Sequence, residues 1–180
     1  MSNINIEKHT LAIADGSSMQ AFVARPDEKG SFPGVLVFQE AFGVNAHIRD
    51  VTQRIAREGY VAIAPELFHR SAAPGFEGRY DDFPSVMPHM KALTEQGLSD
   101  DVRASYEWLR DSSQVTPERI GSIGFCMGGR VSFLANATVA LRAAISFYGG
   151  GIATNPMNPG LLNRVKDLKA PVLLFWGGRD

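Results

Sequence analysis

One short segment of the sequence has the residue types and spacing of a nucleophile site. Residues 120–130 read IGSIGFCMGGR, which places the single cysteine, Cys126, between Gly124 and the pair Gly128-Gly129. A sharp turn from a strand into a helix crowds the backbone at its central residue, so small residues are needed two positions before and after it. A thiol there stands at a helix N-terminus, where the dipole and free N–H groups favour a thiolate and an oxyanion. We therefore interpret Cys126 as a nucleophile rather than as a small buried apolar residue.

A nucleophile at such a turn is expected to be followed along the chain by an acidic residue and then by a histidine. Only two carboxylates follow Cys126. Asp167 lies in a polar helical segment and is interpreted as solvated surface, whereas Asp180 follows the apolar run VLLFW and a Gly-rich turn. Because ligands bind at the carboxyl ends of parallel strands, Asp180 is the predicted acid, with an ordinary turn residue as the alternative. All four histidines precede Cys126, and His69 is interpreted as a polar loop residue rather than as a substitute base.

The loop after the apolar run GVLVF supplies a third element of the predicted site. A nucleophile of this kind takes one oxyanion-binding N–H from the residue that follows it, here Met127, and a second from an earlier loop. Ala41 is the predicted source of the second N–H, because it lies in the loop of residues 39–43 (QEAFG) that follows this strand. Glu40 is a carboxylate close behind the same strand, and the alternative for it is an exposed glutamate at a strand end.

Alternating strands and helices must position these residues. The predicted strands are a hairpin of residues 4–14 and 19–24 around Asp15-Gly16, followed by residues 34–38, 61–64, 119–125, 143–148 and 172–176. The predicted helices lie between Asn45 and Gly59, after Ser99, at 127–136 and at 161–168. This alternation predicts an α/β fold with a mostly parallel central sheet, helices on both of its faces and an N-terminal β-hairpin.

Two stretches between the strands are interpreted in more detail. Residues 69–88 contain several prolines and glycines without a clear period, and we expect an irregular excursion there. Ser99 is the predicted N-cap of the next helix, because Asp100 and Asp101 then lie in its first turn at the positive end of the dipole.

Composition excludes several classes of function. At 180 residues the chain matches one domain by the rough yardstick of ~150 residues. A net charge of −1 without long runs of one sign gives no reason to expect nucleic acid or an anionic membrane as partner. One cysteine excludes an intrachain disulfide and a cysteine zinc site, and we expect neither a metal nor a cofactor. The first residues lack the features of a signal peptide and no apolar run is long enough to span a bilayer, so a cytoplasmic protein is expected.

Four segments together resemble a known family. VFQEAFGVN, GYVAIAPELF, IGFCMGGR and the closing WGGRD are similar to dienelactone hydrolases of the α/β-hydrolase superfamily, and they occur in the family's order over nearly the whole chain. A cysteine in place of serine at the turn, combined with a glutamate in the QE-x-FG loop, is more specific than the superfamily motif.

The resemblance implies a Cys–His–Asp triad in which Cys126 is the nucleophile and Asp180 orients the histidine. It implies that Glu40 contacts the resting thiol and helps to deprotonate it when substrate binds. The implied reaction is hydrolysis of a small-molecule lactone or ester through an acyl-enzyme thioester. Family substrates are carboxylate-bearing dienelactones held partly by arginines, so Arg79 is a predicted substrate-binding residue. Tyr148 is predicted to line the pocket, with a core tyrosine as an equal alternative.

We expect residues 1–180 to form a single α/β-hydrolase domain that is C-terminally incomplete, truncated before the segment that carries the catalytic histidine. The run 172–176 favours this interpretation, because a strand of that composition needs cover on both faces. The full-length protein is then an ester or lactone hydrolase, and this chain alone is expected to be inactive. The alternatives are a broader carboxylesterase or thioesterase, and a non-catalytic fragment.

Overall fold

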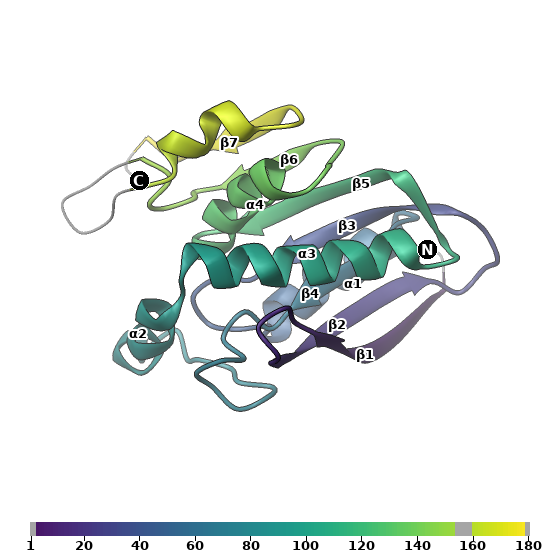
Figure 1. Ribbon diagram of the computed structural model, residues 1–180. Coiled ribbons are helices and arrows are strands. Elements are labelled where there is room, and N and C mark those ends of the chain that lie inside the picture. Colours follow the sequence, from purple (N-terminus) through teal and green to yellow (C-terminus); the bar gives the residue numbers. More distant parts are fainter. Residues whose placement is uncertain (1–2, 154–159, 179–180) are drawn as a thin grey trace.

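A computed structural model describes residues 3–153 and 160–178, and within these ranges the backbone forms one seven-stranded sheet with helices packed against it (Figure 1). The strands are β1 (Ile4–Ala12), β2 (Ser18–Pro26), β3 (Phe32–Phe38), β4 (Val61–Pro65), β5 (Val115–Phe125), β6 (Ala144–Phe147) and β7 (Val172–Phe175). The helices are α1 (Ala46–Arg57), α2 (Phe83–Ala92), α3 (Glu95–Asp111), α4 (Met127–Thr138) and the 3₁₀ helix η1 (Leu162–Asp167).

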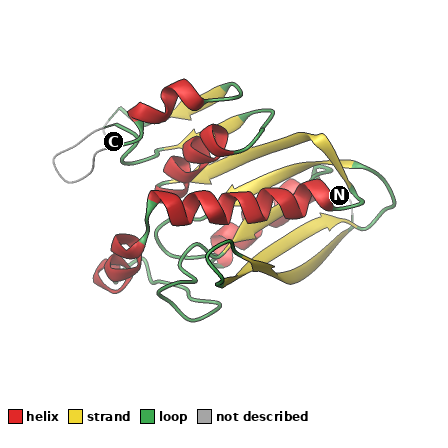
Figure 2. Ribbon diagram, in the orientation of Figure 1, coloured by secondary structure: helices red, strands yellow, loops and turns green. Residues whose placement is uncertain are grey.

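The sheet is mostly parallel, as the sequence predicts. Its strand order is β1-β2-β4-β3-β5-β6-β7, and β4, β3, β5, β6 and β7 run in the same direction. The predicted N-terminal hairpin is confirmed, since β1 and β2 pair antiparallel from Ile4↔Pro26 to Ala12↔Ser18 and β2 then joins β4. The carboxyl ends of β3, β5, β6 and β7 therefore meet along one edge (Figure 2).

Helices cover both faces of the sheet because the central strands are apolar on both sides. Leu36 and Phe38 of β3 pack in the cluster that holds residues of α3 and α4, whereas Val37 packs in the cluster that holds Ile48 and Ala56 of α1. This division follows from the alternation of side chains along a strand. In Figure 1, α3 and α4 lie in front of the sheet and α1 lies behind it. Both faces being buried explains why these strands are continuous apolar runs.

The region between β4 and β5 differs from the sequence prediction in two ways. Helix α2 begins at Phe83, inside the stretch expected to be irregular, because Pro84 occupies the first turn, where a missing N–H is tolerated. Helix α3 begins one turn before Ser99, and its N-cap is Thr94, whose side chain accepts a hydrogen bond from the N–H of Gly97 at 3.0 Å. Ser99 instead donates from within the helix to the Glu95 carbonyl, at 2.8 Å.

The surface beside the last strand is apolar and exposed. Leu173 is 52% exposed, Phe175 44% and Trp176 50%. The rings of Phe125, Phe147 and Phe175 stack across neighbouring strands, with centroid separations of 5.3 and 4.8 Å. An open hollow lies along this aromatic row, between β5, β6 and α1. Among the described residues, no helix is both long and apolar enough to cross a membrane.

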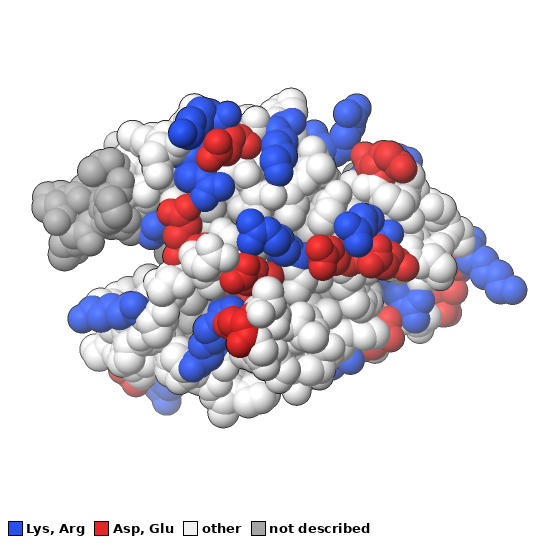
Figure 3. Space-filling model, viewed as in Figure 1, with Lys and Arg blue, Asp and Glu red and all other residues white. Residues whose placement is uncertain are grey.

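Basic and acidic side chains on the surface of α3 form ion pairs and do not cluster into patches of one charge. Blue and red side chains lie side by side along this face in Figure 3. Arg103 contacts Asp100 at 2.9 Å, and Arg110 contacts Asp111 at 2.8 Å. Such exposed pairs contribute about 0–1 kcal/mol each to the free energy of unfolding, so the buried core rather than surface charge holds α3 in place.

Candidate active site

The strand-to-helix turn predicted around Cys126 is present between β5 and α4. Cys126 has φ +54° and ψ −120°, a backbone conformation that L-residues other than glycine rarely adopt. Its N–H donates to the carbonyl of Phe147 on β6 at 3.0 Å, and its own carbonyl accepts from the N–H of Gly129 at 3.0 Å. The thiol is half-buried and stands at the N-terminus of α4.

The glycines around Cys126 are required by close backbone approach. A Cβ atom on Gly124 would clash with the carbonyl oxygen of Gly128, one turn into α4. A Cβ atom on Gly128 would clash with the carbonyl oxygen of Phe38, at the end of β3. The small residues therefore bring α4 against both β5 and β3, which is the steric reason given for the motif in the sequence.

Gly124→Ala is expected to lower the free energy of unfolding by about 2–3 kcal/mol, because the added methyl group must displace the first turn of α4. Urea unfolding measures the change. Gly150→Ala is the matched control, since a Cβ atom there meets nothing within 4 Å and its φ is not positive. Equal unfolding midpoints for the two variants would contradict the close approach.

The thiol lies among one carboxylate and two backbone amides. Burial raises the pKa of the Cys126 thiol, and the negative charge of Glu40 raises it further. Backbone hydrogen bonds from the N–H groups of Met127 and Ala41 act in the opposite direction and lower it. The structure thus brings together four residues that the sequence assigned to the site. Because burial dominates, the thiol is protonated at neutral pH unless a base removes its proton.

Glu40 is held by two tyrosines. The Tyr148 hydroxyl donates to Oε1 of Glu40 at 3.0 Å, and the Tyr80 hydroxyl donates to Oε2 at 2.9 Å. The side-chain amide of Asn45, the N-cap of α1, donates to the Tyr80 hydroxyl at 3.1 Å. Tyr148 follows β6 with φ +40° and was predicted to line the pocket. Burial, Glu40 and the nearby Cys126 all raise the pKa of Tyr148.

Tyr80 is a site residue that sequence reasoning missed. It comes from the connection between β4 and α2, and its ring packs on Phe42 at a centroid distance of 4.4 Å. The N–H of Gly78 donates to the Phe42 carbonyl at 3.0 Å, which fixes this connection against the loop that carries Glu40. No local pattern in the sequence marks Tyr80, because its role depends on the packing of two loops.

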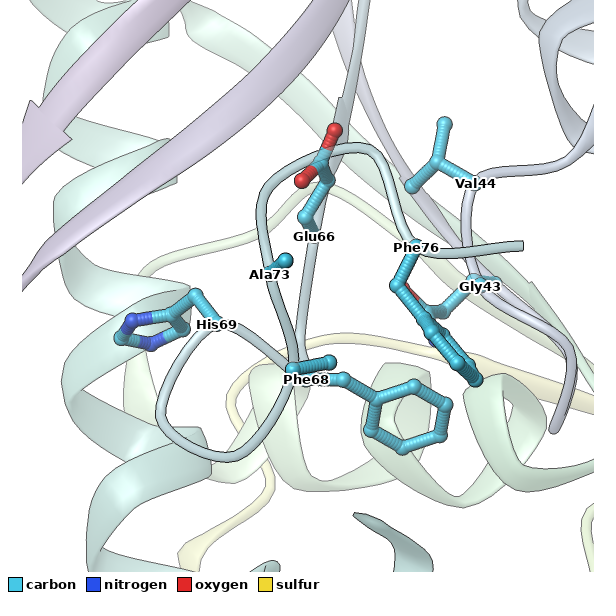
Figure 4. Close-up of a pocket in the computed structure, with 9 residues that line it drawn as sticks. Gly43, Val44, Glu66, Phe68, His69, Ala73 and Phe76 are labelled. Carbon is cyan, nitrogen blue, oxygen red and sulfur yellow. The ribbon is translucent and has the colours of Figure 1, made fainter. Parts of the chain in front are cut away.

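The loops after β3 and β4 are joined through a buried amide. Gln39 is fully buried; its Oε1 accepts from the N–H of Leu67 at 3.1 Å and its Nε2 donates to the Glu40 carbonyl at 3.3 Å. Figure 4 shows the neighbouring pocket, where Phe68 and Phe76 lie close to each other and the ring of His69 points away from them. Gln39 therefore positions the backbone on which Glu40 stands.

Two predicted residues are not brought to this cluster by the described structure. Arg79 contacts Asp81 at 2.6 Å, and both side chains are largely exposed. Asp180 lies outside the described residues, so its predicted role stays a prediction. Between residues 3–153 and 160–178, no group of three His, Cys, Asp or Glu side chains is arranged to hold a metal ion.

The four histidines have partners of their own. His69 is buried and its Nε2 lies 3.1 Å from Oδ1 of Asp101, which also pairs with Arg70. The other three make these contacts: His9 packs against Trp108, His47 against Phe125, and His89 bonds to Ser71. His69, a polar residue of the β4–α2 connection, therefore ties this connection to α3 through Asp101.

Comparison with known proteins decides the family. The model of the dienelactone hydrolase family matches residues 19–180. This chain belongs to the dienelactone hydrolase family. A solved structure from Klebsiella pneumoniae, described as a "Putative Dienelactone Hydrolase", superimposes with a TM-score of 0.84 at 32% identity, and the match covers 99% of this chain and 74% of that one. The α/β-hydrolase fold predicted from the motifs is thereby confirmed.

Two curated relatives are similar to this chain over most of its length. A protein of Synechocystis sp. is 42% identical over 151 residues, which cover 81% of this chain and 60% of the relative. A protein of Escherichia coli K12 is 38% identical over 175 residues, which cover 93% of this chain and 62% of the relative. Both carry the name "Putative carboxymethylenebutenolidase". The chain thus spans about three fifths of the length of these family members.

Proposed function

We propose that this chain is the nucleophile-bearing part of a hydrolase that cleaves lactones or esters of small molecules through a thioester on Cys126. The observation that carries the proposal is the surroundings of the sulfur, which combine the Glu40 carboxylate with the N–H groups of Met127 and Ala41. A thiol, a base and two aligned amide donors are the parts that acyl transfer requires. Membership of the dienelactone hydrolase family supports the same reaction class.

The proposed reaction begins with the proton of the thiol. Glu40 takes this proton, and the thiolate attacks the carbonyl carbon of the substrate. The amides of Met127 and Ala41 bind the oxyanion as it forms, which stabilises charge that develops only on the way to the tetrahedral intermediate. The C–O bond to the leaving alcohol then breaks, the alcohol oxygen takes up a proton, and the acyl group remains on sulfur.

Water completes the cycle by hydrolysing the thioester. A general base must take a proton from this water while the carbon–sulfur bond breaks and the thiol is restored. In the triad that we propose, a histidine oriented by Asp180 is this base. The histidines of this chain have the separate partners described above, so this step is assigned to the complete protein.

A specific observation also favours the broader carboxylesterase or thioesterase. Recognition of a carboxylate-bearing lactone calls for a cation near the nucleophile, and Arg79, the residue predicted for this task, pairs with Asp81 on the surface. A substrate without a free carboxylate does not need that cation. Arg79 and Tyr148 are retained as proposed substrate contacts of the narrower activity.

Trapping of the acyl-enzyme tests the proposal. The protein from the complete reading frame is mixed with p-nitrophenyl acetate and quenched in acid within the first turnovers. It is then digested, and the mass of the peptide that contains Cys126 is measured. An acetyl group on this peptide, together with a burst of nitrophenolate, is expected. A burst with the label on another residue, or no label at all, contradicts the thioester and favours the non-catalytic alternative. Matched esters with and without a carboxylate then separate the two substrate classes by kcat/KM.

A further inference from the structure

Helix α2 is packed differently from the other α-helices. Helices α1, α3 and α4 pack along strands of the sheet, whereas α2 lies apart from them, beyond the N-terminal end of α3 (Figure 1). Val86 is the only fully buried side chain of α2. A segment with few buried apolar contacts opens locally at a lower free-energy cost than a segment of the core. Helix α2 therefore has the packing of a movable element.

The backbone of α2 is also weakly held. The side chain of its N-cap, Asp82, makes no hydrogen bond to the first turn. Pro88 lies inside the helix and has no N–H to donate to the carbonyl of Pro84, so a hydrogen bond between the two halves of the helix is missing. A proline inside a helix is a common site of bending. Residues 83–87 can therefore pivot at Pro88 relative to the second half of α2.

The second half of α2 is anchored to the protein core. Nδ1 of His89 lies 2.9 Å from the Ser71 hydroxyl, and its ring packs on Phe76 at a centroid distance of 4.6 Å. Met90, in the next position, packs against the main core cluster. These contacts hold the second half in place, so movement of α2 is expected in residues 83–87.

The first half of α2 rests on the loop that carries Glu40. The ring of Phe83 is 45% exposed and meets the ring of Phe42 edge to face at a centroid distance of 6.2 Å. Val86 packs beside Gly78 and Phe42, in space that a Cβ atom on Gly78 would take from it. Phe42 lies only two residues after Glu40. Residues 83–87 thus border the loop whose carboxylate and amide surround the sulfur.

We propose that residues 83–87 form a lid beside the thiol, which pivots at Pro88 and admits molecules to Cys126 according to their size. Phe83 and Val86 hold the lid on the Glu40 loop in its closed position. Small molecules reach the half-buried thiol past the closed lid, whereas bulky molecules need it to open. The lid goes beyond the proposed function, because it concerns access to the sulfur and not the reaction that follows.

Two neutral reagents with the same reactive group test the lid. Iodoacetamide is small, N-(1-pyrenyl)iodoacetamide is bulky, and both alkylate a thiolate. In the protein from the complete reading frame, Val86→Ala is expected to raise the rate of the pyrenyl reagent at Cys126 about fivefold or more, because a cavity under the lid favours its open position. The rate of iodoacetamide is expected to stay the same, since this reagent does not need the lid to open. Peptide mass after digestion identifies the labelled cysteine.

Val102→Ala is the matched control for this variant. Val102 is also a fully buried valine on a helix, but it packs in the main core beneath α3. Its urea unfolding midpoint is expected to fall, while the ratio of its two labelling rates is expected to equal the wild-type ratio. An unchanged ratio in Val86→Ala overturns the lid. An equal rise in both variants also overturns it, because general loosening of the fold then explains the faster labelling.

A second variant is expected to move the lid in the opposite direction. Pro88→Ala supplies an N–H for the carbonyl of Pro84 and so stiffens α2 against bending. Its rate with the pyrenyl reagent is expected to fall about threefold or more, and its rate with iodoacetamide is expected to match the wild type. A pyrenyl rate that stays the same or rises contradicts the pivot at Pro88.

The lid and the hydrolase can fail separately. Thiol labelling needs no turnover, so size-selective labelling that responds to Val86→Ala in a protein that hydrolyses no ester supports the lid and contradicts the proposed function. Conversely, an active hydrolase in which Val86→Ala leaves the ratio of the two labelling rates unchanged contradicts the lid and leaves the proposed function standing.

Discussion

In the protein from the complete reading frame, replacement of Cys126 by alanine is expected to lower kcat/KM for p-nitrophenyl acetate by about 10⁴-fold or more, because the reaction then has no atom to carry the acyl group. The oxyanion-binding amides of Met127 and Ala41 remain in the variant. Any residual rate above that of water is therefore assigned to them. Stopped-flow absorbance of nitrophenolate measures both the burst and the steady rate, and the burst is expected to disappear.

The backbone at position 126 offers an internal control for this experiment. Cys126 has φ +54°, where a Cβ atom is strained and glycine is not. Cys126→Gly is therefore expected to unfold at a urea concentration at least as high as Cys126→Ala, although both lack the nucleophile. If either variant kept near-native hydrolysis with its fold intact, the thiol would not be the nucleophile. If alanine were clearly the more stable, the strain argument would be wrong.

Glu40→Gln is expected to change two properties of Cys126 in opposite directions. The charge of Glu40 raises the pKa of the thiol, so its removal lowers that pKa and increases the thiolate fraction at neutral pH. Labelling by iodoacetamide at pH 7 is expected to become several-fold faster, because the thiolate is the form of the cysteine that reacts. Hydrolysis is expected to become about 10²-fold slower or worse, because the proton acceptor is lost.

Opposite changes in the labelling rate and the hydrolysis rate distinguish a general base from a residue that acts only through its charge. If Glu40 only repelled the thiolate, its removal would speed both labelling and hydrolysis. Glu118→Gln is the matched control: this glutamate is exposed on β5, seven residues before the end of the strand. It changes the net charge equally and is expected to alter neither rate. Slower labelling of Glu40→Gln would contradict the placement of its charge beside the sulfur.

Local signals in the sequence were sufficient where the cause is local. The turn at Cys126 follows from Gly124 and Gly128, whose missing Cβ atoms allow α4 to approach β5 and β3. The N-terminal hairpin follows from Asp15-Gly16, where Gly16 has φ +86°. In each case a few neighbouring residues restrict the backbone conformation, so the local sequence is enough to predict the structure.

Local signals failed where several sites competed for one role. Thr94 and Ser99 both have side chains suited to an N-cap, and the acidic pair after Ser99 favoured the wrong one. The reason is tertiary, because Asp101 is fully buried within α3 and binds Arg70 and His69 from another loop. Its position was set by these partners rather than by the helix dipole.

The chain order of residues was enough to place a thiol, a carboxylate and two amides at one edge of a parallel sheet, since the ends of such strands are bound to meet there. It was not enough to say what holds the carboxylate. Glu40 accepts hydrogen bonds from Tyr80, which lies 40 residues away in the sequence, and from Tyr148, which lies 108 residues away. Both hydrogen bonds exist only because strand register and loop packing bring the three side chains together. Hydrogen bonds between such distant residues leave no mark on the residues between them, so only the folded chain reveals them.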